Sequence, residues 1–212
     1  MTYLLNNFDY ILQLTFRHFQ LAIIPVGIAF LIALPLGWLS FRFPRLSSFL
    51  IPLNNILYTV PSIAMMIFLI PFLGLNARSV MAALVIYSQI ILLRNIIAGF
   101  KSIDPSILEA ARGMGMSRLQ IATRIQLPIA LPIILAAVRL ASVISVAIAT
   151  IGAKFGAGGL GVLLFEGIAQ AGRMDKIWIG AIFVGLLALF FNRGILWIEK
   201  TISGRWMQAR QA

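Results

Sequence analysis

The sequence contains no cysteine and only one histidine, His18. Disulfides and thiolate-bound metals are therefore excluded, and a lone histidine beside an apolar run is typical of an interfacial residue rather than of a metal ligand. Only six of the 212 residues are acidic, and none of them lies in the middle of an apolar run. A proton or sodium relay of the kind that secondary transporters use therefore has no evident carboxylate to work with.

Two nucleotide-binding patterns are missing or lack their context. The pattern G-x-x-x-x-G-K-[ST] does not occur, which excludes ATP binding through a P-loop. Residues 156–161 fit G-x-G-x-x-G, but an apolar run of helix length precedes them instead of the strand that a dinucleotide site requires. Catalytic residue types form no cluster either, so we expect no metal, no cofactor and no enzymatic activity in this chain.

Apolar residues, in contrast, are abundant: 61% of the chain is hydrophobic and its mean hydropathy is +1.00. Several runs reach about 20 residues, the length that crosses a bilayer as a helix. The formal net charge is +11, but the basic residues occur singly between the apolar runs and form no stripe of the kind that binds nucleic acid. The sequence predicts an all-α polytopic membrane protein in contact with lipid, with no nucleic-acid partner.

The apolar runs predict about five transmembrane helices. They cover approximately residues 21–41, 47–77, 79–100, 129–152 and 177–197. The second run is longer than a straight span requires and contains Pro52, Pro61 and Pro71, so we expect one kinked span that lines a cavity. Five spans place all basic-rich segments on one side, with the N-terminus outside and the C-terminus inside, whereas six spans would invert some of them.

The segments outside the spans divide the chain further. Residues 1–20 alternate apolar and polar residues and include Asp9 and Arg17, which predicts an interfacial amphipathic helix that is too polar to span. Residues 21–198 form a single transmembrane domain. Residues 199–212 form a basic tail, which the positive-inside rule places in the cytoplasm.

The loop at residues 101–128 is a polar segment with strong helix signals. Asp104 followed by Pro105 predicts an N-cap and a first helical position, and the helix would stop near Gly113 or Gly115. Ser117 and Gln120 have the spacing of a capping box, which predicts a second short helix that ends where Pro128 begins the next apolar run. Two short capped helices between two spans indicate an element that docks onto a partner.

This loop carries a spaced pattern, Glu-Ala-Ala, three residues, Gly, nine residues, Ile-x-Leu-Pro. Its fixed positions are Glu109, Ala110, Ala111, Gly115, Ile125, Leu127 and Pro128. The pattern resembles the EAA loop of permease subunits of type I ABC importers. Residues 58–64, 101–116 and 151–161 further resemble the branch that handles glycine betaine, carnitine and choline, and the resemblance covers about residues 21–199. Lys154 and Glu166 depart from that branch.

The resemblance implies a set of partners in the bacterial inner membrane. These are a second permease chain, identical or a sister, a cytoplasmic ABC ATPase dimer that binds ATP and magnesium, and an extracytoplasmic substrate-binding protein. In the family, Glu109 and Gly115 would lie at the ATPase contact. Two alternatives stay open: the same type of importer for another small solute, such as an amino acid or a betaine-like thiol compound, and an ATP-independent secondary transporter or membrane scaffold.

Several residues are candidates for lining the translocation path. Arg94 and Arg139 lie within spans, where an arginine either extends to the interface or faces a polar interior. The rings of Tyr58, Tyr87 and Trp38 could offer weak cation–π contacts to a quaternary ammonium group, although aromatic residues in spans more often serve packing. The glycine-rich residues 156–161 form either a flexible outer loop or a re-entrant turn, in which glycines let helices approach closely and residues 160–171 form a short helix near the outer mouth. The full set is Tyr58, Thr59, Pro61, Ser62, Arg94, Arg139, Gly156, Gly158, Gly159 and Gly161.

Overall fold

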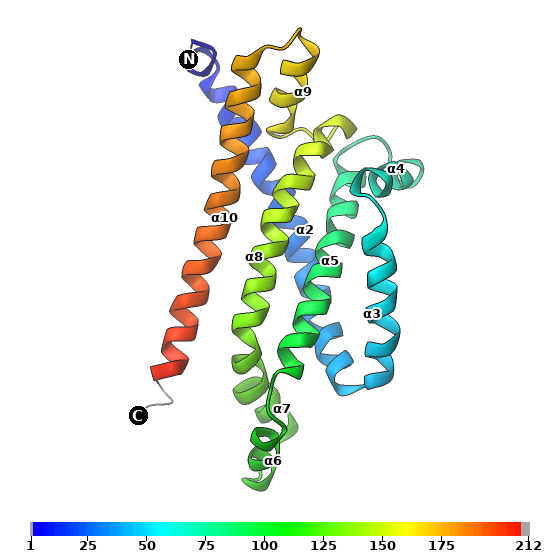
Figure 1. Cartoon of the computed structure of the whole chain (residues 1–212), viewed down its shortest axis with the longest axis vertical. Helices are drawn as coiled ribbons and strands as arrows, with labels where there is room; N and C mark the ends of the chain where they lie inside the picture. The colour runs from blue at the N-terminus through cyan, green and yellow to red at the C-terminus, as the bar shows by residue number, and fades with distance from the viewer. Residues whose placement is uncertain (1, 209–212) are drawn as a thin grey trace.

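Helix formation dominates the computed structural model, which describes residues 2–208, and no strand occurs in that range. Figure 1 shows long helices running side by side, with shorter helices at both ends of the bundle. In chain order the helices are α1 (Thr2–Asn6), α2 (Phe8–Arg42), α3 (Pro44–Thr59), α4 (Ser62–Leu73), α5 (Ala77–Lys101), α6 (Pro105–Gly113), α7 (Arg118–Ile121), α8 (Leu127–Gly152), α9 (Gly161–Ala169) and α10 (Met174–Gln208). A π turn (Ala122–Gln126) joins α7 to α8, and a 3-10 turn (Ala153–Phe155) follows α8.

The expected number of spans is confirmed. Among residues 2–208, four helices are long and apolar enough to cross a membrane, and the bent pair α3 and α4 makes up to five if it counts as one span. Helix α1 and the end of α10 lie at opposite ends of the bundle (Figure 1). Helices α4 and α9 lie at the end that holds α1, and helices α6 and α7 lie at the other end.

The second span bends more sharply than a kinked helix. Helices α3 and α4 meet at 97°, and α4 runs across the end of the bundle in Figure 1. The break falls at Val60 and Pro61, which both have extended backbone angles, and proline contributes no N–H to continue a helix. The Tyr87 hydroxyl of α5 donates a hydrogen bond to the Val60 carbonyl, so a side chain from a neighbouring helix satisfies the backbone at the bend.

The prediction of a separate interfacial helix at residues 1–20 was wrong. Helix α2 begins at Phe8 and runs without interruption through the first span to Arg42. Ile11, Leu14 and His18 form one buried stripe that faces the bundle, while Asp9 and Arg17 are exposed. The polar residues therefore lie on the opposite face of a packed helix, and alternation along the sequence did not reveal this because the helical period is 3.6 residues.

We expected the second short helix of the 101–128 loop to end at Pro128, but the helix continues past this residue. Helix α7 passes through the π turn directly into α8, so residues 118–155 form one continuous helical stretch. A proline ring clashes with the carbonyl four residues before it in an α-helix. A wider turn immediately before Pro128 accommodates that clash, and the helix continues.

The glycine-rich segment at residues 156–161 is a packed turn. His18 lies beneath it, fully buried. Its Nδ1 atom accepts a hydrogen bond from the Leu160 N–H at 3.2 Å, and its Nε2 atom is 3.1 Å from the Val146 carbonyl. Since Nδ1 accepts, Nε2 carries the proton and donates to Val146. His18 is thus a buried connector between α2, α8 and the turn, and not the interfacial residue that its position beside an apolar run suggested.

The turn leaves no room for a side chain at Gly161. A Cβ atom there would lie 2.1 Å from the Thr150 carbonyl oxygen and 2.8 Å from the Ala153 Cβ. Because both neighbours are fixed by helix backbone, Gly161→Ala should displace the turn and lower stability by roughly 1–3 kcal/mol. Thermal unfolding of the detergent-solubilised protein, followed by tryptophan fluorescence, measures this.

The matched control is Gly185→Ala in α10, where nothing lies within 4 Å of the added Cβ. Alanine is the better helix former, so this variant should keep or slightly raise the midpoint. Equal midpoints for the two variants would contradict the close packing of Gly161.

Candidate functional site

The loop between α5 and α8 projects from one end of the bundle (Figure 1), and side chains cap both of its short helices. The Asp104 carboxylate accepts a hydrogen bond from the Ser106 N–H at 2.8 Å. This bond holds the pKa of Asp104 below its usual value, so the charged cap persists at neutral pH and is lost only as the pH falls through that lowered pKa. The predicted capping box is also present: Ser117 Oγ accepts from the Gln120 N–H, and Gln120 Oε1 accepts from the Ser117 N–H.

The seven residues of the spaced pattern divide into an exposed group and a packed group. Glu109, Ala110 and Gly115 are exposed at the end of the loop. Ala111 is fully buried in the core cluster that joins the loop to the spans. The remaining three residues lie half-buried on the helix that returns to the membrane: Ile125, Leu127 and Pro128. The exposed group is available to a partner, and the packed group holds the loop against the bundle.

Gly115 has a backbone conformation that suits its residue type. Its φ angle is +75°, a left-handed conformation that glycine adopts without steric cost. The Met116 N–H bonds back to the Ala111 carbonyl at 3.1 Å, which ends α6 with a tight turn. Glycine at this position therefore allows the chain to reverse between α6 and α7.

Two exposed apolar residues escaped the sequence interpretation. Met114 and Leu119 flank the turn, and each is 73% exposed. Large apolar side chains at this exposure in a polar loop are typical of contacts with another protein. The sequence signal that could have found them is their position: both lie outside the buried stripe formed by Leu108, Ala111 and Ile121.

A hollow of about 700 Å³ lies between the loop and the end of α2. Three arginines line it, Arg42, Arg112 and Arg118, and no acidic residue does. On its wall, Trp38 Nε1 donates a hydrogen bond to Gln126 Oε1 at 3.1 Å. The Trp38 ring thus joins α2 to the π turn, which favours a structural role over a contact with a transported solute.

The candidate path residues are not brought together at one place. Tyr58 and Arg94 line a single hollow between α3, α5 and α8. Thr59, Pro61 and Ser62 lie at the bend between α3 and α4, where the Thr59 hydroxyl bonds its own helix. Arg139 is engaged elsewhere, 3.5 Å from the Glu199 carboxylate and hydrogen-bonded to Asn192 of α10 at 3.3 Å. The four glycines, Gly156, Gly158, Gly159 and Gly161, belong to the packed turn near α9.

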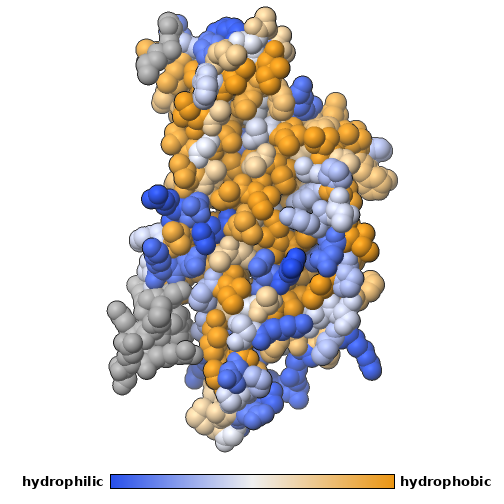
Figure 2. All heavy atoms as spheres, in the orientation of Figure 1, coloured by the Kyte–Doolittle hydropathy of each residue, from blue (hydrophilic) through white to orange (hydrophobic). Residues whose placement is uncertain are grey.

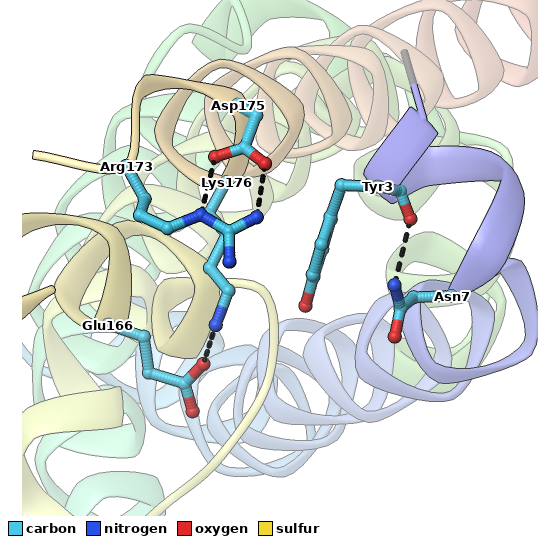
Figure 3. Close-up of polar contacts among 6 residues, drawn as sticks. All are labelled: Tyr3, Asn7, Glu166, Arg173, Asp175 and Lys176. Atoms are coloured by element: carbon cyan, nitrogen blue, oxygen red, sulfur yellow. Dashed lines mark hydrogen bonds and ion pairs between the residues drawn. The ribbon is translucent and has the colours of Figure 1, made fainter.

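The end of the bundle that holds α1 and α9 carries a polar network, drawn in Figure 3. Lys176 Nζ donates to Glu166 Oε2 at 2.9 Å, and Arg173 pairs with Asp175. Both cations lie 5.3 Å from the centre of the Tyr3 ring. Glu166 is therefore half of an ion pair that ties α9 to α10. Lys154, the other departure from the resembled branch, lies 4.7 Å above the Phe165 ring.

These features define a class of protein: a multi-pass membrane protein with a capped loop that projects from one end of its helical bundle. The chain belongs to the family described as binding-protein-dependent transport system inner membrane component, whose profile matches residues 21–204. It is a permease of the type I ABC importer class in the bacterial inner membrane, as the resemblance implied.

Characterised relatives match nearly the whole chain. The glycine betaine/carnitine/choline transport system permease protein OpuCD of Bacillus subtilis is 36% identical over 95% of this chain and 88% of its own length. The osmoprotectant import permease protein OsmW of Salmonella typhimurium is 35% identical over 90% of each chain. Among solved structures, the inward-facing MetNI methionine ABC transporter superimposes with a TM-score of 0.81 at 19% identity, covering 91% of this chain and 95% of that chain. That structure supports the fold alone.

The capping box should stiffen the start of α7. Ser117→Ala removes the acceptor for the Gln120 N–H, and loss of such a cap costs about 1 kcal/mol. We therefore expect hydrogen exchange at residues 117–121 to speed up roughly fivefold, measured by mass spectrometry, with the spans unchanged. Ser48→Ala is the control, because the Ser48 hydroxyl bonds only a carbonyl of its own helix. Unchanged exchange in Ser117→Ala would show that the cap does not hold this helix.

Proposed function

We propose that this permease imports a small osmoprotectant carrying a quaternary ammonium group, such as glycine betaine, carnitine or choline. The observation that carries the proposal is similarity along almost the whole chain to permeases named for these compounds, at 31–36% identity in Bacillus subtilis. An importer of the same type for an amino acid or a thiol-containing betaine is the alternative, and direct uptake separates the two. Membership of the type I ABC importer class disfavours an ATP-independent transporter.

We further propose the partners and the topology. A cytoplasmic ATPase dimer would bind ATP and magnesium and dock on the 101–128 loop, and a substrate-binding protein would approach the end that holds α1 and α9. A second permease chain, identical or a sister, would complete the membrane part. The basic residues at the loop end support a cytoplasmic location for that end under the positive-inside rule: Arg42, Arg45, Lys101, Arg112, Arg118 and Lys200. The N-terminus would then be outside and the C-terminus inside.

The continuous helix from Arg118 to Gly152 supports a mechanical role for the loop. Because α7, the π turn and α8 have no break between them, a displacement of the docked loop would move the span that follows it. Hydrolysis of ATP in the partner would thereby drive a rigid-body switch between outward-facing and inward-facing arrangements. In this proposal the chain catalyses no reaction itself.

Uptake into proteoliposomes tests this function. The permease, its ATPase and its binding protein are reconstituted, and labelled glycine betaine, carnitine, choline and proline are offered with ATP. We expect ATP-dependent uptake of at least one quaternary ammonium compound. Glu109→Lys should abolish it without affecting insertion, because Glu109 is exposed and the change reverses its charge at the proposed contact. Uptake of proline alone would move the cargo to the alternative, and wild-type levels in Glu109→Lys would remove Glu109 from the coupling.

The exposed apolar pair should contribute to ATPase docking. Met114→Ser combined with Leu119→Ser removes two side chains that are each 73% exposed, so folding should be unaffected. Burial of such anchors contributes much of an interface's binding energy, and we expect the affinity for the ATPase subunit to fall at least about tenfold in a pull-down titration. Leu75→Ser is the control, because Leu75 is 63% exposed between α4 and α5 at the opposite end. Equal affinities would place the contact elsewhere on the loop.

A further inference from the structure

A second hollow, of about 340 Å³, lies between α3, α5 and α8 and contains polar side chains within membrane-spanning helices. Its polar lining residues are Asn54, Asn55, Tyr58, Arg94 and Asn95. Polar side chains within a membrane are costly unless they pair with another protein group or face a cavity that holds water or a solute. In Figure 2 the upper half of this face is mostly apolar, whereas hydrophilic residues interrupt the lower half. The hollow is separate from the one beside the docking loop.

Arg94 lines this hollow, is exposed in the isolated chain, and forms no ion pair among the described residues. The ion pairs among the described residues involve Arg139, Arg173 and Lys176, and Arg94 takes part in none of them. No carboxylate lines the hollow. Arg94 is seven residues before the end of α5, about 10 Å along the helix axis. An unpaired guanidinium at this place provides a fork of donors that matches an anionic carboxylate.

Asn54 lines the same hollow but is nearly buried. It is only 8% exposed, and within the described part of the chain its Nδ2 atom has no hydrogen-bond partner. Buried polar atoms are normally satisfied, but the Asn54 Nδ2 atom has almost no accessible surface, so a solute would reach it only after the side chain turns toward the hollow. Asn95 differs, because its Nδ2 atom already donates to the Ile91 carbonyl at 2.8 Å.

Tyr58 adds a surface of a different kind. Its side chain lines the same hollow and is 60% exposed. A quaternary ammonium group has no N–H to donate, so amide oxygens cannot hold it by hydrogen bonds, whereas the face of an aromatic ring attracts it. The hollow therefore combines donors for an anion with a ring for a cation.

Resting on the proposed function, we propose that this hollow is a membrane-embedded binding site for zwitterions that carry both a carboxylate and a quaternary ammonium group. Arg94 binds the carboxylate, and the Tyr58 ring contacts the ammonium group. Choline has the ammonium group but no carboxylate, so it gains nothing from Arg94 and is repelled by its charge. Arg94 thus sets the preference of the permease for zwitterions over choline, independently of the binding protein.

The test measures binding to the permease–ATPase complex without any binding protein. Saturation-transfer NMR follows the trimethylammonium protons of glycine betaine and of choline, because this method detects weak binding. The complex is held in nanodiscs of phosphatidylethanolamine and phosphatidylglycerol, which contribute no choline headgroup. The variants are Arg94→Gln, Arg94→Lys and Tyr58→Leu. The control is Arg193→Gln, since Arg193 is an exposed arginine of α10 that does not line this hollow.

In the wild type we expect glycine betaine to bind more tightly than choline. Arg94→Gln should weaken glycine betaine binding roughly tenfold, as expected for loss of a charge-assisted contact, and should leave choline unchanged or tighter. Arg94→Lys should recover part of the loss, and Tyr58→Leu should weaken both ligands. Arg193→Gln should match the wild type.

Three results would overturn the site: no binding of either ligand to the wild-type complex, an Arg94→Gln value for glycine betaine within twofold of the wild type, or equal weakening of both ligands. If Arg94 only stabilised the fold, Arg94→Gln would weaken both ligands equally, because a folding defect does not distinguish glycine betaine from choline. The uptake assay reports separately on the proposed function. ATP-dependent uptake of glycine betaine without binding at this hollow would retain the importer and remove only the site.

Discussion

Backbone hydrogen bonding in hydrocarbon is the constraint on which the rest of this structure depends. A helix satisfies its own N–H and C=O groups, but each break exposes groups that no water can reach. The chain breaks within the bundle at Val60 and again before Leu160, and a side chain from another helix closes each break. The Tyr87 hydroxyl bonds the Val60 carbonyl, and His18 bonds the Leu160 N–H and the Val146 carbonyl. These bonds position α4 and α9 across the end of the bundle.

At the opposite end, stiffness has a mechanical consequence. Caps define both short helices of the 101–128 loop, and a π turn lets the second of them continue past Pro128 into α8. Because unbroken helix joins the 101–128 loop to α8, we expect the loop and this span to move as one body. The packed group of the loop, centred on Ala111, fixes the other side of the connection to the core. This arrangement suits the proposed coupling to a partner ATPase.

The two intramembrane arginines show how the same residue type takes different roles. Arg139 is compensated by Glu199 and Asn192 of α10, which explains how a charge is tolerated in α8 and favours a structural role. Arg94 meets no carboxylate among the described residues and lines a hollow between α3, α5 and α8. Composition and spacing along the chain could not separate these two cases, because the partners come from helices distant in sequence.

The sequence by itself determined the features that depend on nearby residues. Apolar run length set the spans, Asp104 and Ser117 set the caps, and the spacing from Glu109 to Pro128 indicated the family. Only the tertiary structure decided the uninterrupted course of α2 from Phe8, the continuation of α7 into α8, the partners of His18 and Arg139, and the hollow that Arg94 lines. The physical reason is range: caps and hydropathy act within a few residues, whereas burial and pairing depend on which helices pack together.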